Sequence, residues 1–253
     1  MTDASDAPTR SARRRRQRAP RPWRTGESTT RRWDLEMLAW AVCALGAGLL
    51  AGRAASALLP LETAEGGARA VVWVAMGGAV ALALSRSRPR GLLRVRLVDA
   101  LYGVVFGLAL RVLQGVVAGI PDGPAPWPSM FSVGGALPES FVVDALADTL
   151  VAATLEEFFF RGVVLICVYV LVRRFSGRVA AGIAAVAVAT ALFLIAHLVS
   201  GSAAGLDPIA LAAVGVVTGA FVLGTGRIWP AVAVHVVFNA SGYLLLAVGT
   251  LLA

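Results

Sequence analysis

Seven apolar stretches, most of them long enough to cross a bilayer, follow one another along the 253 residues of this chain. They span residues 35–58, 69–85, 97–119, 141–172, 179–199, 208–225 and 229–252. A membrane helix needs about 20 mostly apolar residues to cross the hydrocarbon core. With 58% hydrophobic and 15% charged residues, the composition is too apolar for a soluble domain. We therefore predict an all-α fold, a polytopic transmembrane helix bundle of about seven spans.

The distribution of arginine indicates how this bundle is oriented. Arginines follow the second, fourth and sixth stretches, in residues 86–96 and 173–178 and at Arg227. The other connections, 59–68, 120–140 and 200–207, carry acidic residues and few basic ones. Because basic loops stay in the cytoplasm, the N-terminus is predicted to be cytoplasmic and the C-terminus to lie outside. We expect a multi-pass integral protein of a bacterial plasma membrane.

The N-terminal region differs from the rest of the chain in composition. Ten arginines and three acidic residues fall in residues 1–32, which accounts for +7 of the net charge of +8. We predict a disordered, arginine-rich cytoplasmic tail over residues 1–33. Beside an apolar span, such a tail contacts anionic membrane lipid, and no nucleic-acid partner is expected. Residues 34–138 are predicted to form N-terminal transmembrane helices and a loop, and residues 139–253 a second helical unit.

Three ionisable residues lie near the middle of the fourth apolar stretch, at Glu156, Glu157 and Arg161. Each costs roughly 2.5–3.5 kcal/mol at the centre of a membrane helix, so a function or a partner is expected. Glu157 and Arg161 are four residues apart and can pair on one face of a helix. Glu156 lies about 100° further round and has no such local partner. A buried polar knot that only joins helices is the alternative interpretation.

The only two histidines of the chain lie in later apolar stretches. Phe193 precedes His197 by one turn, and Asn239 follows His235 by one turn, so each pair shares a helix face. A single membrane histidine is usually a hydrogen-bonded packing residue. Two histidines, an unpaired glutamate and an asparagine on three apolar helices are expected to face one another, because polar groups avoid lipid.

An acidic stripe extends this polar face. Asp144 and Asp148 precede Glu156 at intervals that are multiples of four, on the side that leads toward the outer connections. One interpretation is a water-filled path for substrate. The other is ion pairing with Arg111, the arginine that lies deep in the third stretch.

These side chains are those that peptide hydrolysis requires. Glu156 can take a proton from water, His197 can orient that water, and His235 with Asn239 can stabilise an oxyanion. Glu156, His197 and His235 are also a possible zinc ligand set. Because no His-Glu-x-x-His element is present, we favour a mechanism that requires no cofactor, with zinc as the alternative.

Helix length raises one difficulty for this site. At 1.5 Å per residue from the inner loops, Glu156 and His197 lie roughly 25–28 Å deep, but His235 lies only about 12 Å from Arg227. The segment 224–226 would have to sink into the membrane, or the helices would have to tilt.

Three motifs in order resemble the CPBP group of intramembrane proteases, which includes the type II CAAX prenyl endopeptidases and bacteriocin-immunity relatives. They are Glu-Glu-x-x-x-Arg at 156–161, Phe-x-x-x-His at 193–197 and His-x-x-x-Asn at 235–239. The resemblance covers roughly residues 139–243 and marks 139–253 as the catalytic unit.

This resemblance implies a membrane-embedded endopeptidase. Glu156 is then the activating glutamate, with His197, His235 and Asn239 as the other catalytic residues and Glu157, Arg161 and Phe193 in support. The substrate is expected to be a membrane-associated peptide or lipidated protein, prenylated or a peptide precursor. The alternative is a non-catalytic membrane regulatory or scaffold protein of the same fold.

Overall fold

A computed structural model of the chain describes residues 23–25, 28–119, 127–130, 135–201 and 208–252. Within these residues every regular element is a helix and there is no strand, as predicted. Six helices are long and apolar enough to cross a membrane. They are α2 (Leu35–Leu58), α3 (Leu61–Arg86), α4 (Leu97–Gly119), α8 (Arg178–Ser200), α9 (Pro208–Thr225) and α10 (Trp229–Leu252).

The fourth predicted span is one composite helix from Phe141 to Val172. It consists of α5 (Phe141–Leu146), the π segment η4 (Ala147–Ala152), α6 (Ala153–Glu156), the π segment η5 (Glu157–Val164) and α7 (Leu165–Val172). The residues at each junction keep right-handed helical backbone angles, so the chain does not break. π segments widen a helix and often occur at functional sites.

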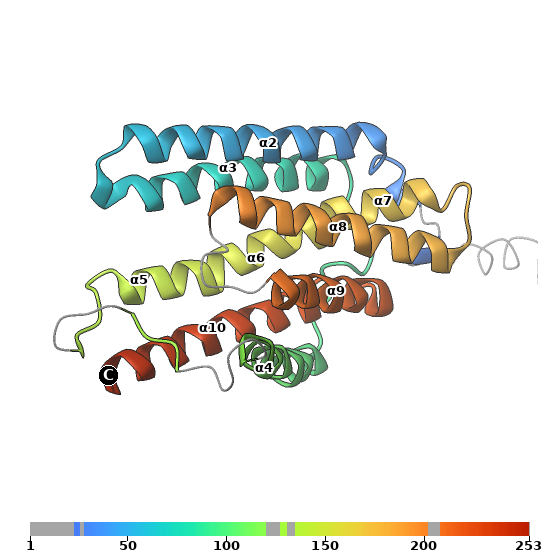
Figure 1. The fold of residues 1–253 in the computed structure, drawn as a ribbon. Helices are drawn as coiled ribbons and strands as arrows, with labels where there is room; N and C mark the ends of the chain where they lie inside the picture. The colour runs from blue at the N-terminus through green and yellow to red at the C-terminus, as the bar shows by residue number, and fades with distance from the viewer. Residues whose placement is uncertain (1–22, 26–27, 120–126, 131–134, 202–207, 253) are drawn as a thin grey trace, which may run out of the picture.

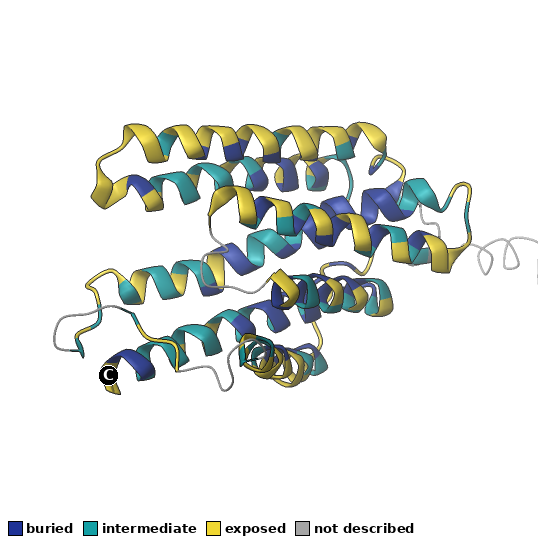
Figure 2. Ribbon diagram, viewed as in Figure 1, coloured by how far each residue is buried: buried dark blue, intermediate teal, exposed yellow. Residues whose placement is uncertain are grey.

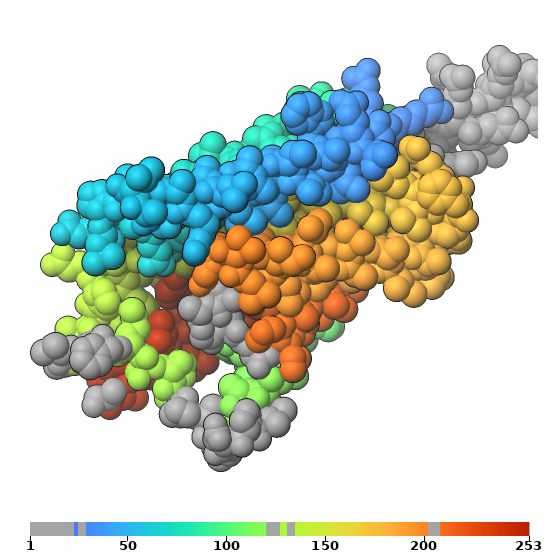
Figure 3. Space-filling model, turned by 45° about the horizontal axis from the view of Figure 1, so that its top comes forward, coloured from blue at the N-terminus to red at the C-terminus, as the bar shows by residue number. Residues whose placement is uncertain are grey.

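The composite helix runs through the middle of the bundle (Figure 1). Every residue from Phe159 to Tyr169 is buried, and Figure 2 shows this concentration of buried positions around α6 and α7. The hairpin of α2 and α3 packs on one side, and α10 packs against α4 and α9 on the other. In Figure 3 the surface of α2 lies beside that of α8, and both cover the central helix.

The outward faces of these helices are apolar. Leu50 on α2 and Val74 on α3 are each 75% exposed, and Leu244 on α10 is 65% exposed. Large apolar side chains at such exposure require a lipid environment, because water would penalise a surface of this kind. The six candidate spans and these faces describe an integral multi-pass membrane protein.

The connections that follow α3 and α9 meet at one end of the bundle. The Ile228 backbone N–H donates to the Leu92 carbonyl at 2.9 Å, and the Trp229 indole donates to the Leu93 carbonyl at 2.9 Å. At the end of α7, Arg173 donates to the carbonyl of Arg24. The basic connections therefore share an end, which is the grouping that the arginine distribution predicts.

Part of the predicted tail is folded, in contrast to the expected disorder of residues 1–33. The short 3-10 turns η1 (Trp23–Thr25) and η2 (Ser28–Thr30) precede α2, and Trp23 and Trp33 are each 1% exposed. Their indole groups donate to the carbonyls of Gly226 and Ser87. Two large aromatic rings supply enough apolar area to order a polar segment. Residues 1–22 and 26–27 lie outside the described residues.

The turn between α9 and α10 lies below the surface of the basic end. Arg227 is 8% exposed and its guanidinium bonds the carboxylate of Asp99 at the start of α4. Ile228 is fully buried. The first residues of α10 are therefore packed inside the protein beside the start of α4, although Gly224 in the preceding turn is exposed.

Candidate active site

Glu156 is the last residue of α6, directly before the π segment η5. Its side chain is 15% exposed, whereas the adjacent side chain of Glu157 is fully buried. Within the described residues Glu156 accepts no hydrogen bond. The two neighbouring acids therefore have different surroundings, and Glu156 is the one that a water molecule or a substrate can reach.

Both histidines converge on Glu156, as predicted. The Glu156 Oε2 atom lies 3.8 Å from His197 Nε2 on α8 and 3.9 Å from His235 Nε2 on α10. These distances exceed a direct hydrogen bond, and polar groups at such separations are commonly joined by a shared water. Three helices far apart in sequence thus bring one carboxylate and two imidazoles together.

The orientation of the His197 ring follows from its backbone contact. His197 Nδ1 lies 2.9 Å from the Phe193 carbonyl oxygen, one turn earlier on α8. A carbonyl only accepts hydrogen bonds, so Nδ1 carries the proton in this contact. In the neutral ring Nε2 is then an acceptor, and it points toward Glu156.

The His235 ring is held by the second glutamate. His235 Nδ1 lies 2.8 Å from Glu157 Oε1, and the His235 side chain is only 5% exposed. Because a carboxylate accepts, Nδ1–H donates in this contact and Nε2 faces Glu156. Glu157 therefore contacts a candidate catalytic residue directly, a role that its spacing from Arg161 did not predict.

Glu157 and Arg161 also form the predicted ion pair. Arg161 NH1 lies 3.1 Å from Glu157 Oε1, and both side chains are fully buried. The N–H directions do not meet hydrogen-bond geometry, and within the described residues the guanidinium nitrogens have no hydrogen-bond partner. The Arg161 guanidinium carbon lies 4.3 Å from the centroid of the Phe193 ring. Charge attraction and the aromatic face therefore hold this cation.

Phe193 links these groups into one layer. Its ring is fully buried and its centroid lies 4.2 Å from that of His197 and 5.9 Å from that of His235. Phe160 contacts it edge-on at 5.4 Å. The Phe193 ring therefore contacts both imidazoles, and its supporting role stays a prediction.

Asn239 lies one turn after His235 on α10. Its Nδ2 donates to the backbone carbonyl of Asp148 at 3.0 Å. Ser241, two residues later, instead donates to the Phe238 carbonyl and contacts Arg111. Asn239 thus shares the His235 side of the helix and contacts the central composite helix, whereas Ser241 points elsewhere.

The acidic stripe does not pair with Arg111. Arg69 on α3 bonds Asp144 at 2.6 Å and Asp148 at 3.0 Å. The Tyr243 hydroxyl donates to Oδ2 of the Asp148 carboxylate, an oxygen that Arg69 also contacts. Arg111 is held by Gln114, Ser241 and the Phe238 carbonyl. The sequence did not predict the contacts of Arg69, which lies at the edge of an apolar stretch, or of Tyr243. The position of Tyr243 one turn after Asn239, on the same face of the helix, could have indicated its contact.

The spacing of the same residues can be compared with that of a zinc site. Zinc ligands at about 2.0–2.2 Å in a tetrahedron lie roughly 3.3–3.6 Å apart, and the two carboxylate–imidazole separations here are 3.8 and 3.9 Å. Across the part of the chain that the structure describes, no group of three or more His, Cys, Asp or Glu residues is arranged to hold a metal ion. The two carboxylate–imidazole separations are therefore slightly longer than the spacing between zinc ligands.

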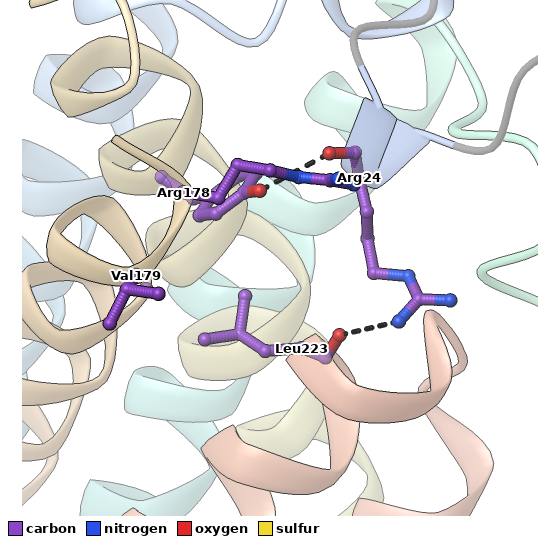
Figure 4. A pocket seen from close by; sticks show the side chains of 6 residues that line it. Arg24, Arg178, Val179 and Leu223 are labelled. Carbon is purple, nitrogen blue, oxygen red and sulfur yellow. Dashed lines mark hydrogen bonds between the residues drawn. The ribbon is translucent and has the colours of Figure 1, made fainter. Parts of the chain in front are cut away.

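A separate cavity of about 240 Å³ lies at the basic end of the bundle. Figure 4 shows Arg24, Arg178, Val179 and Leu223 around it, with Arg24 donating to the Leu223 carbonyl. None of the candidate catalytic residues lines this cavity. It belongs to the contacts of the N-terminal segment with α8 and α9 and is distinct from the candidate active site.

Comparison with protein families gives one match. Residues 138–241 match the family described as Rce1-like, Type II CAAX prenyl endopeptidase Rce1-like. This range includes all three motifs and confirms the resemblance drawn from them. No curated protein and no solved structure gives a significant match to the chain.

Proposed function

Because residues 138–241 belong to the Rce1-like type II CAAX prenyl endopeptidases, a family of membrane proteases, we propose that this intramembrane protease cleaves its substrate with a water activated by Glu156. One observation carries the proposal. The Glu156 Oε2 atom faces the Nε2 atoms of both histidines at 3.8 and 3.9 Å, inside a membrane bundle. Side chains so placed can hold one water beside a peptide carbonyl.

In the first step, the water donates one hydrogen bond to Glu156 and the other to His197 Nε2. The acceptor state of Nε2 follows from the Nδ1 contact with the Phe193 carbonyl. With both hydrogens so directed, the oxygen lone pairs face the substrate. The water oxygen attacks the carbonyl carbon while its proton passes to Glu156, and a tetrahedral intermediate with an oxyanion forms.

The oxyanion is stabilised by His235 and Asn239. His235 Nδ1 faces the Glu157 carboxylate at 2.8 Å, so Nε2 can donate only if the ring carries both protons. The Glu157 charge supports that imidazolium, and Arg161 supplies a nearby positive charge for Glu157. Asn239 offers the Nδ2–H that Asp148 does not use. Donors aimed at a developing charge commonly lower the barrier of such reactions more than any other group.

The intermediate then collapses with cleavage of the C–N bond. The proton held by Glu156 passes to the departing amine, and the carboxylate is restored for the next water. Every proton in this sequence moves between the water, Glu156 and the leaving group. We therefore propose a reaction without a metal ion, in which the atoms and protons of the hydrolysis balance without a cofactor.

The proposed substrate is a peptide segment at the membrane, either prenylated near its C-terminus or part of a peptide precursor. Family membership supports a protein substrate. The exposed apolar faces of α3 and α8, with Val74 at 75% and Ile195 at 51% exposure, would contact a lipid-anchored substrate that arrives through the bilayer. Membrane lipid is therefore a further expected partner.

Two experiments test this function. Purified protein in liposomes would be given fluorogenic peptides that end in a CAAX sequence, with and without a farnesyl group, and cleavage would be followed by mass spectrometry. In cells, the membrane proteome of the wild type would be compared with that of Glu156→Gln. We expect the wild type to give prenyl-dependent cleavage in liposomes or precursor fragments in cells, and Glu156→Gln to give neither. Glu62→Gln is the control and should keep the wild-type activity, because Glu62 is an exposed glutamate outside the site. Equal cleavage by wild type and Glu156→Gln would contradict the proposal.

A further inference from the structure

The amide of Asn239 is held in one orientation by the backbone of another helix. Its Nδ2 donates to the Asp148 carbonyl at 3.0 Å. An amide group has two N–H donors on one nitrogen, so this contact uses one donor and directs the second. If the Asp148 carbonyl moved, the amide could rotate, and its oxygen would then face the oxyanion and repel it.

The Asp148 backbone carbonyl, in the π segment η4, accepts a second hydrogen bond besides the one from Asn239. The donor of this second bond is the Ala153 backbone N–H, five residues later, in the wider π geometry. The side chain of Asp148 is 27% exposed and its helix runs between α3 and α10. We therefore expect the position of this widened turn to depend also on the contacts of the Asp148 side chain.

Two side chains, from α3 and α10, hold the Asp148 carboxylate. Arg69 NH1 donates to Oδ1 at 3.0 Å and to Oδ2 at 3.1 Å, and the Tyr243 hydroxyl also donates to Oδ2, at 2.5 Å. Arg69 also bonds Asp144 at 2.6 Å, one turn earlier. Tyr243 is one turn after Asn239, so α10 contacts Asp148 twice, once at its carbonyl and once at its carboxylate.

We propose that Tyr243 and Arg69 are positioning residues that fix the Asp148 turn and so aim the free N–H of Asn239 at the oxyanion. This inference rests on the proposed oxyanion role of Asn239. Both residues lie outside the range 138–241 that matches the family. The N-terminal helix α3 and the end of α10 therefore contribute to the chemistry of a domain that does not include them.

The proposal is tested with a double-mutant cycle on purified protein. Tyr243→Phe removes the hydroxyl and keeps the ring, which packs edge-on against Phe141 at 5.7 Å. We expect kcat to fall about tenfold, the scale of one lost hydrogen bond to a charged group, with KM unchanged. Asn239→Ala alone is expected to lower kcat about 10²–10³-fold, as for other oxyanion donors. In the Asn239→Ala background, Tyr243→Phe should have no further effect on kcat.

Single-turnover rates with enzyme in excess allow the slow variants to be measured. Tyr102→Phe is the matched control, because the Tyr102 ring packs on Phe221 and its hydroxyl has no hydrogen-bond partner within the described residues. For Arg69, Arg69→Gln should lower kcat and Arg69→Lys should restore part of it, since a lysine keeps the charge beside Asp148. Melting temperatures of all variants would be recorded alongside.

The outcomes separate this inference from the proposed function. Wild-type kcat for Asn239→Ala would overturn the oxyanion role and the positioning inference with it. A slow Asn239→Ala together with an unaffected Tyr243→Phe would overturn the positioning inference alone. An equal fall in kcat on Tyr243→Phe in the wild-type and Asn239→Ala backgrounds would also overturn the positioning inference. Such additivity would mean that Tyr243 acts independently of Asn239.

Discussion

Glu157 Oε1 lies 2.8 Å from His235 Nδ1, and the same oxygen lies 3.1 Å from Arg161 NH1. One fully buried carboxylate oxygen therefore serves both the ion pair within its own helix and the orientation of an imidazole on α10. The second acid of the Glu-Glu pair thus combines a structural and a positioning role. Glu156, in contrast, is partly exposed and faces both histidines without bonding either.

The double role of Glu157 predicts different defects for the two members of the ion pair. Glu157→Gln and Arg161→Gln each leave a buried charge without its partner, which costs about 3–5 kcal/mol of stability. Glu157→Gln also removes the charge that supports the His235 imidazolium, so its kcat should fall further, by an additional factor of about 10². Thermal melts and cleavage rates on the same preparations measure both effects. Equal kcat for the two variants would contradict the role of Glu157 toward His235.

Glu156→Gln should separate activity from stability. The substitution keeps the side-chain volume and removes the base, so cleavage is expected to fall about 10²–10⁴-fold. Because Glu156 makes no hydrogen bond within the described residues, the melting temperature should stay close to that of the wild type. A Glu156→Gln protein that melts as low as Glu157→Gln would show that Glu156 is instead part of the structural pair.

Metal removal tests the cofactor proposal. In the reaction described above, chelator treatment and gel filtration leave the cleavage rate of the purified protein unchanged, and added zinc does not increase it. The physical reason is that Glu156 and His197 by themselves can accept hydrogen bonds from both protons of the attacking water. Zinc measured at one equivalent by elemental analysis, and lost in parallel with activity, would instead establish a metalloenzyme.

Close packing of α4 on α10 predicts a size limit at Gly107. A Cβ atom there would lie 2.7 Å from the Val237 Cβ and 2.9 Å from the Val234 carbonyl oxygen. Gly107→Ala should therefore push α4 away from the helix that carries His235 and Asn239, with a loss of about 1–3 kcal/mol and a lower cleavage rate. The measurement is a thermal melt together with a rate.

Gly115→Ala on the same helix is the matched control, because nothing lies within 4 Å of its added Cβ. Alanine favours a helix over glycine, so this variant should be neutral or slightly more stable. Equal destabilisation by both substitutions would mean that helix flexibility, and not the contact with α10, determines the effect at Gly107.

Helix positions could be predicted from the sequence because apolar length alone decides what crosses a bilayer. The stretches 35–58, 97–119 and 229–252 coincide with α2, α4 and α10. The pairing of Glu157 with Arg161 and the shared faces of Phe193 with His197 were also predictable, since residues four apart lie on the same side of one helix. The order of the three motifs was enough to indicate the protease family whose description residues 138–241 match.

Contacts between helices could not be predicted in the same way. Helical period says which residues share a face but not which helix that face meets, so Asp148 was open to Arg111 and is in fact held by Arg69. The contact of Trp23 with Gly226 could not be predicted either. The many arginines of the tail indicate disorder, but composition does not show which parts of the bundle can bury an indole ring.

The position of each helix along its neighbours was the other quantity that only the tertiary structure decided. His235 Nε2 lies 3.9 Å from Glu156 Oε2, although the two residues are at different distances along their helices from the basic end. The sequence by itself determined the helices, their order and the polar residues on each. Packing between neighbouring helices determined their rotation and depth, and these bring Glu156, His197 and His235 together, because a side chain in a bundle can meet only what the adjacent helices present to it.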